Sequence, residues 1–382
     1  MQIQNRYELD IFVDDLDFFK TNGCVLMCAD IWEAINNPIP VCKLEMSVPI
    51  AWIDNRSLVD GSLIKFHIRC NKYKFDDVYL FRVFNLERLN LDQGFVHVVV
   101  DAVLDFYPGY RYGSDFNMYG QTSSIFKKIA EKFDLDSNID STNDSMTWVA
   151  GENSLYNFMT YMTQYAWVND TSAMFWCFDR GKRLLFKNLT TLFRNRQDKI
   201  WKFVQSAAPN VDEKQYSYSQ VHSSLQSGTN NIRNEGYGGS DAYFDFLSYK
   251  MKDVSAKKVV AESKMMNISK ELSKGLAQQF FPFDIGNFHS NYYLAYKQNR
   301  RILSTYSSYT VLKTEFLQSY RLGQIVNFEY TDSMNDNNKL ESLSGVYMID
   351  AIHIMITTSS IKSNVELVMQ GLNGKNTLQE TY

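Results

Sequence analysis

Short runs of alternating apolar and polar residues dominate the first hundred positions of the chain. These runs carry β-branched and aromatic residues and are bounded by Asn, Asp and Gly: "KLEMSVPIAWI" (43–53), "GSLIKFHIRC" (61–70), "YLFRVFNLERL" (79–89) and "GFVHVVVDAVLDF" (94–106). Because side chains alternate between the two faces of a strand, the pattern predicts strands with one buried face. We therefore expect a β domain over residues 1–112.

The apolar period changes to that of a helix after Gly120. The stretch "TSSIFKKIAEKF" (122–133) places its apolar residues on one helical face behind a Thr122/Ser123 cap: Ile125, Phe126, Ile129, Ala130 and Phe133. A second helix, "SLYNFMTYMTQYAW" (154–167), starts behind Asn153 and Ser154 with its own inward face: Leu155, Phe158, Met159 and Met162. The stretch "AMFWCFDRGKRLLFKNL" (173–189) predicts two strands joined by a tight turn at Gly181. Residues 113–200 are thus expected to form a helix-helix-hairpin module.

The remainder of the chain predicts a second β domain interrupted by helices. Strand-like alternation at Tyr216 and Tyr218 is followed by a loop at Gly236–Gly239. The stretches 256–280 and 291–303 have helical periodicity and are separated by breakers around Pro282 and Gly286. Strand patterns then return at "SYTVLKTEFLQ", "GQIVNFEY", "GVYMIDAIHIMITT" and "SNVELVMQGL". We expect a discontinuous β domain over 201–250 and 306–373, a helical insertion over 251–305, and a tail over 374–382.

One strand pattern occurs twice. Gly61-x-x-Ile64-x-Phe66 opens a strand and is followed, after a polar loop, by two long strands. Gly323-x-x-Val326-x-Phe328 opens another series in the same order. Each series begins at a glycine turn, a conformation that a residue without Cβ adopts easily. The pattern alone fits either a duplication or a coincidence of common strand starts.

Composition limits the classes of function. The 382 residues are 45% hydrophobic and 21% charged, the mean hydropathy is −0.31, and no apolar run approaches the ~18 residues that cross a bilayer. No secretory signal is visible, so synthesis in the cytoplasm and no stable membrane insertion are expected. The net charge of −4 argues against a protein that grips phosphate backbones. Aromatic residues make up 15%, with 24 Tyr and 26 Phe, which suits β-sheets and large protein interfaces.

The cysteines and histidines offer candidate chemistry but no recognisable motif. The five cysteines are scattered and favour buried thiols over metal ligands: Cys24, Cys28, Cys42, Cys70 and Cys177. Four histidines stand alone: His67, His97, His222 and His289. No HExxH, GxSxG or GxxxxGK[ST] motif occurs, and no cofactor, metal site or catalytic residue is predicted.

Asp350 and His353 are polar residues inside an apolar strand pattern. Residues three apart on a regular strand point to opposite faces, so these two side chains should not meet. The favoured interpretation makes His353 a half-buried residue that hydrogen-bonds a neighbouring strand. A catalytic role would need a partner from elsewhere in the chain.

The stretch "YYLAYKQNRR" combines aromatic and basic residues: Tyr292, Tyr293, Tyr296, Lys297, Arg300 and Arg301. Such a helix could stack on nucleic-acid bases, but the acidic chain favours a surface helix that docks on a protein partner. Paired carboxylates of a glycan or peptidoglycan hydrolase remain open, because their spacing is a three-dimensional quantity. A carbohydrate-binding or receptor-binding module is a further alternative.

The order of these parts resembles the baseplate hub protein of contractile-tailed bacteriophages, a family related to the N-terminal part of the VgrG spike protein of type VI secretion. The resemblance rests on "SIFKKIAEKFDL", "MTWVAGENSLYNFMTYMTQYAWV", "FWCFDRGKRLLF", "YRLGQIVNFEY" and "GVYMIDAIHIMITTSSIKSNVELVMQGL". The late strand matches the family pattern of an aromatic, alternating aliphatics and a histidine at Tyr347, Ile349, Ile352 and His353. The first 50 residues match nothing in that family.

The resemblance implies a β-rich α+β fold with two tail-tube-like β-barrel domains, the helix-helix-hairpin module and the helical insertion. It implies a structural, non-enzymatic homotrimer in the tail baseplate of a virion, with no cofactor. Three chains with two similar barrels each would form a pseudo-sixfold ring between a sixfold tail tube and a threefold spike. The implied partners are the central spike, the tail tube or its initiator, and baseplate wedge proteins, with DNA passing through the lumen without specific binding.

Overall fold

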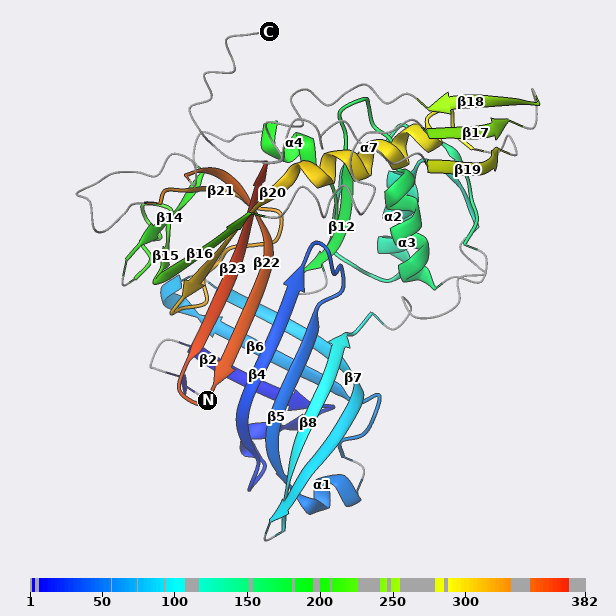
Figure 1. Cartoon of the computed structure of the whole chain (residues 1–382). Coiled ribbons are helices and arrows are strands. Elements are labelled where there is room, and N and C mark those ends of the chain that lie inside the picture. Colours follow the sequence, from blue (N-terminus) through cyan, green and yellow to red (C-terminus); the bar gives the residue numbers. More distant parts are fainter. Residues whose placement is uncertain are drawn as a thin grey trace.

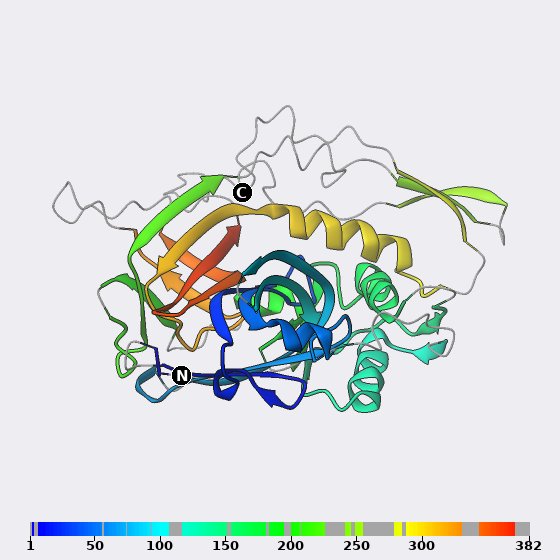
Figure 2. The same cartoon turned by 90° about the horizontal axis from the view of Figure 1, so that it is seen from below.

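The chain is described by a computed structural model that covers residues 2–3, 7–55, 57–73, 75–92, 94–106, 117–150, 154–180, 183–194, 200–206, 208–225, 241–245, 249–254, 279–284, 288–330 and 344–370. Within this part of the chain, most strands belong to one 15-stranded sheet. The first portion of the sheet curls into a half-barrel, and few helices accompany it (Figure 1). Figure 2 shows the same half-barrel from below. The predicted β-rich fold is confirmed.

The first hundred residues supply the half-barrel. Its strands are β1 (Gln2–Ile3), β2 (Tyr7–Val13), β3 (Leu16–Asp17), β4 (Val25–Ala34), β5 (Val41–Pro49), β6 (Leu63–Cys70), β7 (Phe75–Asp92) and β8 (Phe95–Leu104), with short helices η1 (Phe18–Lys20), α1 (Ile50–Asp54) and η2 (Asn71–Tyr73). In β6, Ile64, Phe66 and Ile68 are fully buried while the residues between them are partly exposed. The period of two in the sequence thus sets the buried face.

The strand predicted over 43–53 ends earlier than expected. The ladder between β5 and β8 stops at Pro49, which pairs with Phe95, and the next residues form the helical turn α1. Proline has no N–H to donate to a further ladder bond. Trp52 and Ile53 are buried by this turn instead of by a strand.

The middle of the chain forms the predicted helices and hairpin. Its elements are β9 (Met118–Gly120), α2 (Thr122–Lys132), β10 (Ser137–Ile139), β11 (Met146–Trp148), α3 (Leu155–Tyr165), β12 (Met174–Asp179), β13 (Arg183–Asn188) and α4 (Leu189–Arg194). The predicted apolar faces of α2 and α3 are buried, apart from the half-buried Phe133. β12 and β13 pair as an antiparallel hairpin, and the predicted turn residue Gly181 lies outside the described residues.

The two helix caps have different outcomes. Ser154 caps α3 as predicted, because its hydroxyl accepts the N–H of Asn157. The predicted Thr122/Ser123 cap is wrong: α2 begins at Thr122, and Gln121 precedes it without a side-chain cap. The carboxylate of Asp144 instead accepts both the N–H and the hydroxyl of Thr122, at 2.8 Å each. A residue distant in sequence therefore satisfies the helix terminus.

The second half contributes the remaining strands of the large sheet. They are β14 (Trp201–Gln205), β15 (Gln215–Tyr218), β16 (Gln220–Leu225), β20 (Tyr306–Thr314), β21 (Ile325–Phe328), β22 (Gly345–Thr357) and β23 (Ile361–Gln370). The region predicted as a helical insertion contains strands as well as the long helix α7 (Tyr292–Thr305). β17 (Asp241–Asp245), β18 (Lys250–Val254) and β19 (Gln279–Asp284) form a separate small sheet. Most of the helix predicted over 256–280 lies outside the described residues.

Two series of five strands have the same pairing order, and each contains the three strands found in the sequence pattern. The first series is ordered β6-β7-β8-β5-β4, and the second is ordered β21-β22-β23-β20-β16, with every pair antiparallel. Gly61 and Gly323, which open β6 and β21, both have positive φ, at 88° and 72°. Their N–H groups donate to equivalent carbonyls, those of Val83 and Ile349. The repeated sequence pattern therefore corresponds to a repeated topology.

A β-bulge falls at the same point of both series. Phe84 in β7 interrupts the ladder to β8, and Asp350 in β22 interrupts the ladder to β23. Counted from the pairs to β6 and β21, Phe84 and Asp350 occupy equivalent positions. A bulge inserts one residue and bends the strand locally, so the shared position indicates that both series bend in the same way.

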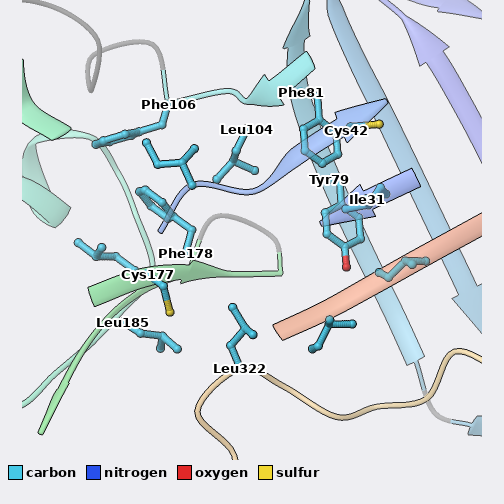
Figure 3. Close-up of a cluster of buried hydrophobic side chains, with 14 of the residues drawn as sticks. Ile31, Cys42, Tyr79, Phe81, Leu104, Phe106, Cys177, Phe178, Leu185 and Leu322 are labelled. Atoms are coloured by element: carbon cyan, nitrogen blue, oxygen red, sulfur yellow. The ribbon is translucent and has the colours of Figure 1, made fainter. Parts of the chain in front are cut away.

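One hydrophobic core extends through the half-barrel, the middle part with its helices and hairpin, and the second half of the chain. Figure 3 shows Ile31, Tyr79 and Phe81 from the half-barrel beside Phe178 of β12 and Leu322, which precedes β21. These five side chains are at most 4% exposed. Contacts of this kind hold the parts together as one packed body.

Candidate assembly site

The two strand series are joined edge to edge by β4 and β22, which lie side by side in Figure 1. Their antiparallel register runs from Ala351 opposite Ala34 to Thr357 opposite Cys28. Ile354 and Ile31 face each other and are fully buried. The joint therefore combines a backbone ladder with a buried apolar face.

His353 lies on the opposite, partly exposed face of this joint. Its Nε2 is 2.8 Å from Oδ1 of Asp30, and its ring stacks on Trp32 with centroids 4.7 Å apart. About a quarter of each of the His353 and Asp30 side chains is exposed. The prediction that His353 hydrogen-bonds a neighbouring strand is confirmed, and the partner strand comes from the other end of the chain.

Asp350 sits at the bulge of β22 and does not contact His353 in any described interaction. Its carbonyl accepts the N–H of Ile35 at 2.9 Å. Burial, and then the nearby Glu366, raise the pKa of the Asp350 carboxyl to about 6. The alternation assumed from the sequence breaks here, since Ile349 and Ile352 are three apart and both buried. The position of Asp350 thus reflects the bulge and not a regular strand.

A buried charged cluster joins all three parts of the chain. We call it the charged cluster; it consists of Glu33, Asp77, Asp179, Arg180 and Arg321. Nη1 of Arg180 is 2.9 Å from Oδ2 of Asp77, and Nη2 of Arg321 is 2.9 Å from Oδ1 of the same carboxylate. Nε of Arg180 is 3.8 Å from Oε2 of Glu33. The cluster ties β4 and β7 to the end of β12 and to the segment before β21.

Aromatic rings enclose the Arg180 guanidinium. Its centre lies 5.0 Å from the ring centroid of Phe75 and 5.5 Å from that of Tyr320, distances at which cation–π attraction operates. The Arg180 side chain is fully buried, so this contact and the carboxylates replace its water shell.

Burial dominates the electrostatics of the cluster. It raises the pKa of Glu33 to about 8, against the lowering effect of Arg180, and it raises the pKa of Asp179 as well. Three carboxyl groups face two guanidinium groups, so one carboxyl is in excess. Glu33, whose oxygens accept no hydrogen bond from the described residues, is the group that retains a proton near neutral pH. The three carboxyl groups are at most 6% exposed, unlike the open, water-accessible carboxylate pair that glycoside hydrolysis requires.

The remaining histidines and cysteines stay apart. His67 pairs with Asp76 at 2.6 Å, and Nε2 of His289 lies 3.0 Å from the carbonyl of Tyr165. His97 is on β8, and His222 is exposed on β16. All five cysteines are free thiols, and in the described ranges no three His, Cys, Asp or Glu side chains gather as a metal site. Likewise, none of the described helices is long and apolar enough to span a bilayer.

The aromatic and basic helix α7 packs one face against α3, and docking of its other, partly exposed face on a partner stays a prediction. Tyr292 stacks on Tyr165 of α3 with centroids 4.0 Å apart, and its hydroxyl is 2.8 Å from that of Tyr161. Nη1 of Arg300 donates to the hydroxyl of Tyr296 at 2.8 Å. Tyr292 and Tyr293 are less than a tenth exposed, so their rings are not available to bases. The predicted loop at Gly236–Gly239 and the side chain of Arg301 lie outside the described residues.

Sequence reasoning missed the charged cluster and the Trp32 stack. The available signal was the pair Asp179-Arg180 directly after the apolar run "AMFWCF", together with the polar Glu33 in the strand "CVLMCADIW" and its continuation. Charged residues next to fully buried runs require partners, but the partners lie far away in sequence.

Comparisons with known structures agree with this architecture. The chain is similar to a tail protein from Neisseria meningitidis MC58, with a TM-score of 0.57 at 7% identity, covering 96% of this chain and 98% of that one. It is also similar to the 43 kDa tail protein of prophage MuSo2 from Shewanella oneidensis, with a TM-score of 0.56 at 9% identity, covering 94% and 98%. The chain has the fold of phage tail proteins. The resemblance predicted from the sequence is thereby confirmed for the fold, and the tail-protein fold extends over nearly the whole chain.

The sequence itself gives no further assignment. No protein-family model matches it, and no curated protein sequence does. Residue identity to the tail proteins is below one in ten, so the similarity shows the fold alone.

Proposed function

We propose that the chain is the structural hub of a phage tail baseplate, acting as a homotrimer without catalysis. The observation that carries the proposal is the repeated strand order, with β4 of one series paired to β22 of the other. Each chain supplies two similar wedges, residues 1–112 and residues 201–250 with 306–373. Three chains then present six similar wedges around a ring.

Such a ring resolves a mismatch of symmetry. A sixfold tail tube meets six quasi-equivalent wedges on one side, and a threefold spike meets three identical chains on the other. The tail tube or its initiator, the spike and the baseplate wedge proteins are the proposed partners. The proposed location is the virion tail, and the fold shared with phage tail proteins supports it.

DNA would pass through the lumen of the ring. The net charge of −4 favours a surface along which DNA slides without binding. Tyr292 and Tyr293, which could have stacked on bases, are buried, and this also supports passage without specific contacts.

The oligomeric state and shape test the proposal. Light scattering on the purified chain should give three times 44.4 kDa, alone or with the spike added, and electron microscopy should show a threefold ring with a central hole. A compact monomer without a hole under both conditions would overturn it. Turnover of cell-wall glycan that disappears when one carboxylate is replaced would support a hydrolase instead.

A further inference from the structure

The joint between β4 and β22 has a counterpart that the single chain leaves open. β4 is the outer strand of the first series, and it pairs with the part of β22 that extends past β21. The equivalent outer strand of the second series is β16, and the equivalent long strand of the first is β7. The same two edges thus exist in both series.

Both counterpart edges are unpaired within the described residues. β7 pairs with β6 only as far as Arg82, so the edge of Phe84–Asp92 away from β8 has no strand beside it. β16 pairs with β20 alone. The two strands are the ends of the path β7-β8-β5-β4-β22-β23-β20-β16, and Figure 1 places them on opposite sides of that path.

We propose that β16 of one chain pairs with the second half of β7 of the next chain, repeating the β4–β22 joint between copies. This inference rests on the proposed ring and specifies its contact. The interface is head-to-tail, because one copy contributes β16 and the other contributes β7. A contact of this kind closes into a ring when its rotation divides a full turn.

The internal joint fixes the expected register. The strand ladders can be followed from β4 through β5 to β8 in the first series, and from β16 through β20 to β23 in the second. This gives equivalent positions for Asp30 and His222, for Ile31 and Ser223, and for Trp32 and Ser224. The ladders also align His353 with Glu87 and Ile354 with Arg88. Because Ile354 faces Ile31 inside the chain, Arg88 should face Ser223 of the neighbouring copy.

The two residues of one polar contact in the internal joint have counterparts on the open edges, where the acid and the histidine have exchanged strands. Inside the chain, the imidazole of His353 on the long strand meets the carboxylate of Asp30 on the outer strand at 2.8 Å. At the equivalent positions, the long strand carries the carboxylate of Glu87 and the outer strand carries the imidazole of His222. Both residues are exposed, and the Glu87 carboxylate accepts a hydrogen bond of 3.3 Å from the side-chain amide of Asn85 on its own strand. The two open edges therefore carry one acid and one histidine that could pair between copies as Asp30 and His353 pair within one chain.

The open edge of β7 also carries exposed apolar side chains. Phe84 is 57% exposed and Leu89 is 50% exposed, each at an irregularity of the β7–β8 ladder. An unpaired edge strand with large apolar residues favours self-association. A second copy that pairs with β7 would cover both its unpaired backbone edge and its exposed apolar side chains.

Cysteine cross-linking of the full chain tests the register. The double variant Arg88→Cys/Ser223→Cys, oxidised at the highest soluble concentration, should give covalent dimers and closed trimers on a non-reducing gel. Each single variant controls for the five natural thiols, and Arg88→Cys/Glu131→Cys places the second thiol on the exposed face of α2, away from both edges. Arg88→Cys/Val221→Cys, two residues out of register, should react more slowly.

The outcomes separate this inference from the proposed function. Trimers by light scattering without rapid Arg88–Ser223 cross-linking would overturn the joint while leaving the ring. Cross-linked chains of increasing length without closed trimers would support the joint and count against the ring. A chain that stays monomeric and does not cross-link would overturn the joint, because the contact is one of self-association.

A charge exchange tests the polar contact without new thiols. Glu87→Arg should raise the protein concentration at which half of the chains are trimeric by at least tenfold. Adding His222→Glu should reverse most of this increase. Glu131→Arg, an equal charge change on α2, should leave association unchanged. Equal effects of Glu87→Arg and Glu131→Arg, or no rescue by His222→Glu, would contradict the pairing.

Discussion

The guanidinium of Arg180 lies 2.9 Å from the carboxylate of Asp77 and joins the end of β12 to β7 inside the protein. Replacing Arg180 with Met should lower the free energy of unfolding by about 3–5 kcal/mol, because it leaves buried carboxylates without their main counter-charge. Urea denaturation followed by circular dichroism measures the change.

Lys362→Met is the matched control for Arg180→Met. Lys362 pairs with Glu315 at 2.6 Å, but both side chains are about half exposed, so the loss should stay within about 1 kcal/mol. Equal losses for the two variants would show that the charged cluster adds nothing beyond a surface ion pair.

Glu33 should make stability depend on pH. Burial holds its pKa near 8 in the folded chain, whereas the unfolded chain releases this proton near pH 4.5. The folded state therefore binds more protons in this window, and the free energy of unfolding decreases as the pH rises. Glu33→Gln keeps the neutral shape, so the variant should gain about 1.4 kcal/mol over the original chain for each pH unit between about 5 and 8.

Denaturation at a series of pH values measures the Glu33 effect. The difference between the two chains is the informative quantity, since groups outside the charged cluster, such as Asp350, are present in both. A difference that does not change with pH would contradict a buried, protonated Glu33. Glu131→Gln, on the exposed surface of α2, serves as a control and should show no such trend.

The glycine turns should be sensitive to any side chain. Gly61 has φ of +88°, and a Cβ there would meet no atom within 4 Å, so Gly61→Ala should cost only the backbone strain of about 1–2 kcal/mol. Gly23 has φ of +84°, but its Cβ would also overlap the ring of Phe95. Gly23→Ala should therefore lower the melting temperature more than Gly61→Ala, as calorimetry can show; the reverse order would contradict the described turn.

Local features of this chain could be predicted from the sequence, whereas contacts between distant parts could not. The cap of Ser154 on α3, the buried face of β6 and the turns at Gly61 and Gly323 depend on residues within a few positions. The cap of α2 comes from Asp144, 22 residues away, so the local Thr122/Ser123 pattern named the wrong acceptor.

The contacts of the candidate site depend even more on residues that are distant in sequence. The sequence identified His353 as a strand residue with a polar partner, but Asp30 is 323 positions away and no local pattern names it. The Arg180–Asp77 pair spans 103 positions. The repeated series could be found because its glycines and alternation recur in order, but the shared bulge at Phe84 and Asp350 has no residue type in common and depends on strand pairing.

His353 and His222 occupy opposite situations in the single chain, and their alanine variants should differ accordingly. His353→Ala removes the stack on Trp32 and the contact with Asp30, which should cost about 1–2 kcal/mol of unfolding free energy. His222→Ala, at an exposed position, should leave the unfolding of the dilute chain unchanged and weaken only its association. Denaturation at low and high protein concentration distinguishes the two effects, because only association depends on concentration. An equal loss for both variants in the dilute chain would contradict the internal joint as the template for the joint between copies.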